Sequence, residues 1–115
     1  MMTVNSGNVV IDNTWLWRAD HDVTGDVKDS NNPVQNGLIV NGDDVIAYGL
    51  KVEHTLGDLT LWKGENGTTI MYQSELPYDV DQTYGDQGFA GYRVNADVQS
   101  HTGYGIGVYS FFRDH

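Results

Sequence analysis

Two segments of the chain share one design, and this repeat constrains the fold more than any other feature. Residues 8–18 and 44–54 each consist of a polar residue, a short apolar run, a two-residue corner and a second apolar run. Three apolar positions coincide when the segments are aligned: Val9 with Val45, Ile11 with Ala47, and Leu16 with Val52. One coil of a parallel β-helix needs such a strand, bend and strand, because a coil turns corners instead of forming hairpins.

The other apolar residues also form short runs without helical spacing, so the sequence predicts an all-β protein. The predicted strands are residues 9–11, 14–18, 38–40, 45–48, 50–52, 59–62, 68–73, 92–94 and 106–111. Two polar stretches, residues 19–35 and 76–91, are predicted loops. The repeat favours a parallel β-helix, and we expect a right-handed one with about four or five coils of roughly 20 residues each, filling residues 1–115 as one segment. The alternative is an antiparallel sandwich, in which the Asn-Gly and Gly-Asp pairs would close hairpins.

Alternation of side chains along the predicted strands assigns their faces. The inward residues are Val45, Ala47, Leu50, Val52, Leu16, Ile70 and Tyr72. The outward residues are Lys51, Glu53, Met71, Gln73, Glu75, Trp15 and Trp17. Two outward Trp residues are unusual on an inert surface. They form an exposed platform for sugar stacking, or the loop at residues 19–35 covers them.

Glu53 and Glu75 are separated by about one coil, and both are assigned outward. Residues one coil apart stack at about 4.8 Å, which predicts that the two carboxylates are neighbours. The alternative is that the turns between them shift the register. Glu53 would then be solvated, or paired with Lys51 or Lys63.

Residues 72–79, with the sequence YQSELPYD, resemble a motif of glycoside hydrolase family 55. Further segments look like the later β-helix coils of bacterial proteins related to that family: residues 13–21, 36–42, 48–54 and 105–109. The resemblance covers nearly the whole chain. It implies a pectate lyase-like fold, in which this chain is part of a larger β-helix domain. It also implies an exo-acting, inverting β-1,3-glucanase with Glu75 as the general acid, and a β-glucan polysaccharide or oligosaccharide as the partner.

An inverting glycosidase needs an acid to protonate the leaving oxygen and a base to activate water, at about 6.5–9.5 Å from each other. Gln73, Glu53, Trp17 and Tyr78 are the candidate substrate contacts beside Glu75. In the resembling family the residues that position the attacking water lie upstream, so we expect the isolated chain to be inactive. The alternative function is a non-catalytic carbohydrate-binding or structural β-helix fragment that associates with another chain.

The charge of the chain excludes several classes of partner. Six Lys and Arg against 16 Asp and Glu give a net charge of −10, which repels nucleic acid and anionic membranes. The exposed ends of a short β-helix make a homo-oligomer possible. The first residues, Met1 to Gly7, lack the pattern of a signal peptide, and a segment of a secreted parent would look the same, so localisation stays open.

No cofactor or metal site is predicted. The chain has no cysteine, and its histidines, His21, His54, His101 and His115, are too scattered for a zinc motif and are expected in turns or at the surface. Aspartates near turns could bind calcium, but their spacing matches no EF-hand loop, and a solvated surface is the preferred interpretation. They are Asp20, Asp22, Asp43, Asp44, Asp79, Asp81 and Asp86.

Overall fold

The computed structural model describes residues 1–27 and 31–113 and consists almost entirely of β-strands. The strands are β1 (Met2–Val4), β2 (Val10–Asp12), β3 (Trp15–Trp17), β4 (His21–Asp22), β5 (Gly25–Asp26), β6 (Leu38–Val40), β7 (Ile46–Glu53), β8 (Thr60–Trp62), β9 (Gly67–Glu75), β10 (Tyr92–Val94) and β11 (His101–Tyr109). One short helix, α1 (Gln82–Asp86), interrupts them in the described part of the chain. The prediction of an all-β protein is confirmed.

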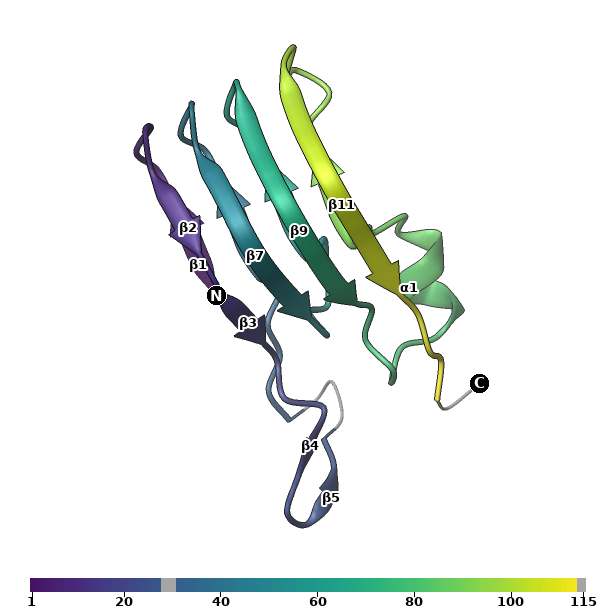
Figure 1. The fold of residues 1–115 in the computed structure, drawn as a ribbon. Helices are drawn as coiled ribbons and strands as arrows, with labels where there is room; N and C mark the ends of the chain where they lie inside the picture. The colour runs from purple at the N-terminus through teal and green to yellow at the C-terminus, as the bar shows by residue number, and fades with distance from the viewer. Residues whose placement is uncertain (28–30, 114–115) are drawn as a thin grey trace.

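The strands build two parallel sheets between which the chain alternates. One sheet has the order β1-β6-β8-β10, and the other has the order β2-β7-β9-β11 with β3 also paired to β7. Every pairing in both sheets is parallel, so the antiparallel sandwich is excluded. Figure 1 shows β2, β7, β9 and β11 side by side and pointing the same way. Successive stretches of sequence therefore lie on top of one another in sequence order.

The predicted repeat is present as strand pairing. Ile11 pairs with Ala47, and Leu16 pairs with Val52. The side chains of the inner face are fully buried and form the core with their neighbours: Val45, Ala47, Leu50, Val52, Leu38, Val40, Leu59 and Trp62. Burying each Val or Leu side chain contributes about 1.5–3 kcal/mol, so the apolar core between the two sheets holds the stack together.

A column of left-handed residues makes the bend in each long strand. Asn13, Gly49, Met71 and Gly105 all have positive φ, between 46° and 67°, and the register of the flanking residues places them above one another. A left-handed residue interrupts the alternation of faces. The prediction that Ile70 faces inward is therefore wrong: Thr69 is the buried residue before the bend, and Ile70 pairs with the exposed Tyr48.

Several predicted boundaries also differ from the observed ones. The two predicted strands at residues 45–48 and 50–52 form one bent strand, β7, and β9 extends to Glu75. The predicted loop at residues 19–35 contains the antiparallel pair β4–β5, which projects beyond the end of β3 in Figure 1. The predicted loop at residues 76–91 contains α1. Strand β1 was not predicted, because Met2–Val4 is too short to show a pattern.

The last strand, β11, lies at the edge of its sheet. Within the described residues it pairs on one side only, with β9. Large apolar side chains along this strand and just after it are exposed: Tyr104, Ile106, Val108, Tyr109, Phe111 and Phe112. No helix in the described part of the chain is long and apolar enough to cross a membrane.

The turns between coils stack backbone against backbone, which leads to a test by mutation. A Cβ on Gly64 would lie 1.9 Å from the carbonyl oxygen of Gly42, and one on Gly42 would lie 2.0 Å from that of Ser6. We expect Gly64→Ala to force the turns apart and to lower the free energy of unfolding by about 1–3 kcal/mol in urea titrations.

Gly85→Ala is the matched control for this substitution. Gly85 lies in α1, where the nearest atom to an added Cβ is the end of the Gln82 side chain at 3.4 Å. An alanine in this helix is expected to leave stability unchanged or to raise it by about 1 kcal/mol. Equal stability of the two variants would contradict the close stacking of the turns.

Candidate functional site

Four residues at the carboxyl ends of β3, β7, β9 and β11 form one column in the strand register. Trp17 pairs with Glu53, Glu53 with Glu75, and Glu75 with Tyr109. The predicted pairing of Glu53 with Glu75 is thus present in the strand register, and the turns between them do not shift it. Glu53 is only 7% exposed, however, so the alternative of a solvated Glu53 is wrong. Two residues earlier, Lys51 pairs with Trp15 and with Gln73 in a second column.

Glu75 is the end residue of β9, and its carboxyl group is held by neighbouring donors. Gln73 Nε2 donates to Glu75 Oε1 at 3.2 Å, and the Tyr78 hydroxyl donates to Glu75 Oε2. His54 Nε2 lies 3.9 Å from the same Oε2 atom. A carboxyl oxygen has more than one lone-pair site, so these contacts orient the group and leave lone pairs free for a ligand. Its side chain is 26% exposed, which keeps it accessible to a ligand.

Tyr78 is fixed as a hydrogen-bond donor. Burial raises the pKa of Tyr78, and the hydrogen bond to Glu75 and the charge of Glu75 raise it further. A tyrosine with a raised pKa stays protonated near neutral pH, so its hydroxyl donates to the carboxylate. Its ring lies edge-on against His54, with 4.5 Å between the ring centroids.

His54 was not among the predicted site residues, and the expectation of a surface or turn position is only half correct. It follows β7 in a left-handed turn with φ 63°, but it is buried. His21 is exposed as expected, His101 is partly buried, and His115 lies outside the described residues. A signal did exist in the sequence: His54 directly follows Glu53, and histidine is enriched among the few non-glycine residues that adopt positive φ.

Asp20 connects the indole of Trp17 to this cluster. Its Oδ1 atom accepts from Trp17 Nε1 at 3.2 Å and lies 3.1 Å from His21 Nδ1 and 3.5 Å from His54 Nε2. Burial acts to raise the pKa of Asp20, but the charge of His54 and hydrogen bonds from His21, its own backbone and Trp17 outweigh it, so the pKa is lowered. Asp20 is therefore a carboxylate at neutral pH.

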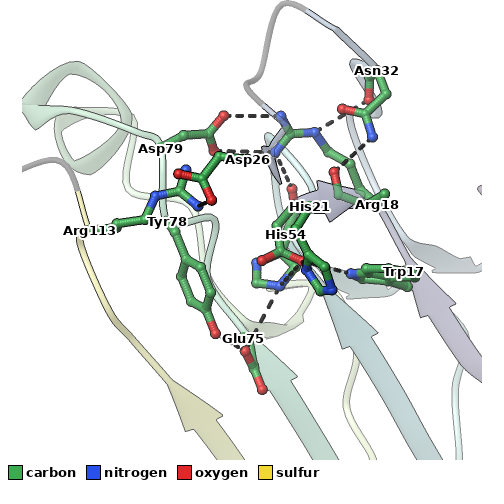
Figure 2. A network of polar contacts seen from close by, with 12 residues as sticks. Trp17, Arg18, His21, Asp26, Asn32, His54, Glu75, Tyr78, Asp79 and Arg113 are labelled. Atoms are coloured by element: carbon green, nitrogen blue, oxygen red, sulfur yellow. Dashed lines mark hydrogen bonds and ion pairs between the residues drawn. The ribbon is translucent and has the colours of Figure 1, made fainter. Parts of the chain in front are cut away.

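A buried ion pair anchors the two loops that flank the site. Arg18 Nη2 lies 3.2 Å from Asp79 Oδ2, with side chains 0% and 4% exposed, and Arg18 Nη1 donates to the His54 carbonyl oxygen at 2.9 Å. Arg18 Nε donates to the Asn32 carbonyl oxygen at 3.3 Å. Figure 2 shows these residues around the ends of the strands, with Tyr78 and Glu75 below Asp79. One side chain thus holds residues 32, 54 and 79 together.

The two outward Trp residues are exposed, so the described residues of the loop, 19–27 and 31–35, do not cover them. Trp15 is 58% exposed and Trp17 is 37% exposed. Their rings stack with centroids 5.5 Å apart and planes 22° apart, and Trp17 also contacts the ring of His21. An exposed, stacked aromatic pair beside a carboxyl group is a surface that suits a sugar ring.

The structure brings four of the predicted residues together and places the clefts elsewhere. Gln73, Glu75 and Tyr78 are in direct contact, and Glu53 is the strand partner of Glu75. Trp17 joins them through Asp20 and His54. Two open clefts of about 500 and 570 Å³ flank α1 and are lined by other residues, among them Val80, Tyr84 and Phe89. Among the described residues, no group of three acidic, His or Cys side chains is arranged to hold a metal ion.

The chain resembles known proteins in both sequence and structure. Residues 1–75 match the model of the LAM55 pectate lyase-like domain. The chain is 45% identical over 116 residues to an exo-β-1,3-glucanase of Streptomyces sp. (strain SirexAA-E / ActE), with 96% of the chain and 19% of that protein covered.

The solved structure of sacteLam55A from Streptomyces sp. SirexAA-E has a TM-score of 0.88 and 46% identity. It is matched over 96% of this chain and 21% of its own. A variant of sacteLam55A in complex with glucose has the same TM-score and 45% identity, over 96% of this chain and 20% of its own. The chain spans about a fifth of the length of these relatives.

The Arg18–Asp79 pair makes a prediction for stability. Arg18→Met leaves a carboxylate buried without its partner, which we expect to cost about 3–5 kcal/mol of unfolding free energy. The double variant Arg18→Met/Asp79→Leu removes both charges and should recover most of that loss. Chemical denaturation of the three proteins measures these differences.

The control for this prediction is Arg93→Met. Arg93 pairs with Asp58 at 2.8 Å, but its side chain is 40% exposed, so the loss is expected to be about 0–1 kcal/mol. Similar costs for Arg18→Met and Arg93→Met would show that the buried pair does not anchor the loops.

Proposed function

Because the chain belongs to the family of LAM55 pectate lyase-like domains, we propose that it is the acid-bearing segment of a domain that hydrolyses β-1,3-glucan. In this proposal residues 1–115 belong to a larger right-handed parallel β-helix, and its coils here are β1–β3, β6–β7, β8–β9 and β10–β11. The relatives are about five times longer than the chain, which supports a larger parent domain.

The observation that carries the proposal is the environment of Glu75. It is an accessible carboxyl group at a strand end, oriented by Gln73 and Tyr78 and paired in register with Glu53. In the reaction, Glu75 gives its proton to the glycosidic oxygen as the bond from that oxygen to the anomeric carbon breaks. A water molecule adds its hydroxyl group to this carbon and loses its other proton to a base.

The base of an inverting reaction is not supplied by Glu53 in this proposal. Neighbouring strands are about 4.8 Å apart, whereas the acid and the base of an inverting enzyme are separated by about 6.5–9.5 Å to leave room for water. Glu53 is instead assigned to substrate contact, together with Gln73 and Tyr78. The base then comes from another part of the larger domain, which agrees with an inactive isolated chain.

The aromatic pair gives the glucan a binding surface. A glucosyl ring stacked on Trp17 would lie at the head of the column that continues through Glu53 to Glu75. The exposed ring of Trp15 extends this surface along β3. Glucose bound to a variant of sacteLam55A supports a sugar as the ligand class.

A second candidate function is a non-catalytic fragment that binds carbohydrate or associates with another chain. The observation that favours it is β11, whose outer edge is unpaired in the described residues and whose side chains include exposed Val108 and Tyr109. A free strand edge with apolar side chains is a site for pairing with another strand. A second copy of the chain is the partner that we propose.

The enzyme proposal is tested by supplying the missing part of the domain. A chimera in which this chain replaces the matching segment of the Streptomyces exo-β-1,3-glucanase should release glucose from laminari-oligosaccharides. We expect Glu75→Gln in this chimera to lower kcat by about 10²–10⁴-fold, because general acid catalysis is lost while the shape is kept.

Glu65→Gln is the matched control, because Glu65 lies before the opposite end of β9 and caps the backbone at Gln99 and Ser100. It should keep the rate. A folded chimera that binds oligosaccharide and retains its rate with Glu75→Gln would rule out Glu75 as the acid. A folded chimera that binds without any hydrolysis would favour the second candidate function.

The association proposal predicts a salt dependence. The net charge of −10 keeps copies apart at low salt, and screening at higher salt should allow β11 edges to associate. Val108→Lys should suppress the increase in mass seen by light scattering, whereas Val23→Lys in the exposed β4–β5 turn should not. A chain that stays monomeric at high protein and salt concentrations would contradict association.

A further inference from the structure

One oxygen atom of Asp20 gathers donors from three places along the chain. Trp17 Nε1 is at the end of β3, His21 Nδ1 is in β4, and His54 Nε2 follows β7. Local turn formation explains the contacts to Trp17 and His21, which are three residues and one residue away in sequence. It does not explain His54, which reaches Asp20 from a different layer of the stack.

His54 faces two carboxyl groups with the same nitrogen. Its Nε2 atom lies 3.5 Å from Asp20 Oδ1 and 3.9 Å from Glu75 Oε2. Its Nδ1 atom is buried and has no hydrogen-bond partner in the described part of the chain. Among the described residues only Nε2 has acceptors in front of it, so an N–H group on Nε2 has carboxyl oxygens beside it, whereas one on Nδ1 has none. The ring therefore directs its N–H toward Asp20 and Glu75 together.

The position of His54 is fixed from its backbone and from its ring. The backbone N–H of His54 donates to the Glu75 carbonyl oxygen at 2.9 Å, and the backbone carbonyl oxygen of His54 accepts from Arg18 Nη1 at 2.9 Å. The Tyr78 ring packs against the imidazole (Figure 2). A movement of the imidazole would therefore have to move Asp20, Tyr78 or Glu75 as well.

We propose that Asp20 and His54 are positioning residues that couple the orientation of the Trp17 indole to that of the Glu75 carboxyl group. Asp20 Oδ1 accepts from Trp17 Nε1 and lies 3.5 Å from His54 Nε2, so one oxygen contacts both side chains. His54 turns the same nitrogen toward Glu75, beside the donors from Gln73 and Tyr78.

The role of this coupling rests on the proposed function. A glucosyl ring on Trp17 would then stabilise the arrangement in which Gln73 and Tyr78 donate to Glu75 and His54 Nε2 lies 3.9 Å from it. These donors become stronger partners as Glu75 loses its proton and gains negative charge. Substrate stacking and acid catalysis would thus be linked through two residues that touch neither the glycosidic oxygen nor the water.

The coupling is measured on the full chain without substrate, by NMR of the Trp indole and His imidazole N–H groups. Glu75→Gln should shift the His54 Nε2 signal and, through Asp20, the Trp17 Nε1 signal. In an Asp20→Ala background the Trp17 signal should no longer respond to Glu75→Gln. The Trp62 indole is the internal reference, because it is buried and its Nε1 has no hydrogen-bond partner among the described residues.

Three further variants separate coupling from simple packing. Asp22→Asn is the control for Asp20, because Asp22 bonds Thr24 and should leave the response intact. His54→Phe keeps a ring against Tyr78 but removes the N–H, so the response at Trp17 should disappear. His54→Gln restores a side-chain N–H donor and should restore part of the response.

These NMR measurements test the coupling independently of the enzyme proposal. A His54 that carries its proton on Nδ1 alone, or a Trp17 response that survives both Asp20→Ala and His54→Phe, would overturn the coupling. Loss of the response in those two variants would support it even if the chimera hydrolysed nothing. Laminari-oligosaccharide should shift the Trp17 Nε1 signal. If the His54 Nε2 signal also shifts, and does so only when Asp20 is present, the coupling operates in the bound state as well.

Discussion

The parallel hydrogen-bond register between successive layers is the constraint on which the rest of this structure depends. It sets Glu53 beside Glu75 and places Trp17 and Tyr109 in the same column. Each layer must enter and leave its bend at the same position for this to hold. The left-handed residues Gly49 and Met71 make this bend at matching positions in adjacent layers, with nearly equal φ values of 59° and 60°. A regular backbone thus allows distant residues to form one site.

The site itself depends on interactions outside the ladder of strands. Arg18 is buried on an apolar scaffold and is compensated by Asp79 and by two carbonyl oxygens. Breaking this ion pair lowers the free energy of unfolding strongly, because removal of one partner leaves a buried charge behind. The loop that carries Tyr78 is therefore fixed relative to the end of β9, where Glu75 lies. The polar contacts of Arg18 fix the positions of the loops around the site, while the apolar core stabilises the fold.

The sequence predicts the parts of the fold that follow from alternation and repetition. The core positions Ala47 and Val52 and the pairing of Glu53 with Glu75 could be derived because both layers keep the same spacing through a bend. Ile70 could not be placed, because a methionine in the left-handed region gives no signal comparable to glycine or asparagine.

His54 and Asp20 were missed as site residues for a related reason. Both residues belong to the site because side chains from two layers contact the same oxygen atom of Asp20. No periodicity in the sequence predicts that contact. Glu75 could be identified only through the motif at residues 72–79, because its register alone does not distinguish it from other outward carboxylates. Trp17 was placed on the correct face, but its exposure depended on where the chain of residues 19–27 runs.

The column of Trp17, Glu53, Glu75 and Tyr109 also shows where this architecture tolerates changes in length. The stretches from one column residue to the next are 36, 22 and 34 residues long, yet the strands remain in register. The longer two take up their extra residues directly after the column, as the segment that carries β4–β5 and the segment that carries α1. Insertions at this corner leave the stack unchanged and add chain at the rim of the site. Natural variation and laboratory loop grafting can therefore reshape the surroundings of Glu75 while the underlying scaffold stays the same.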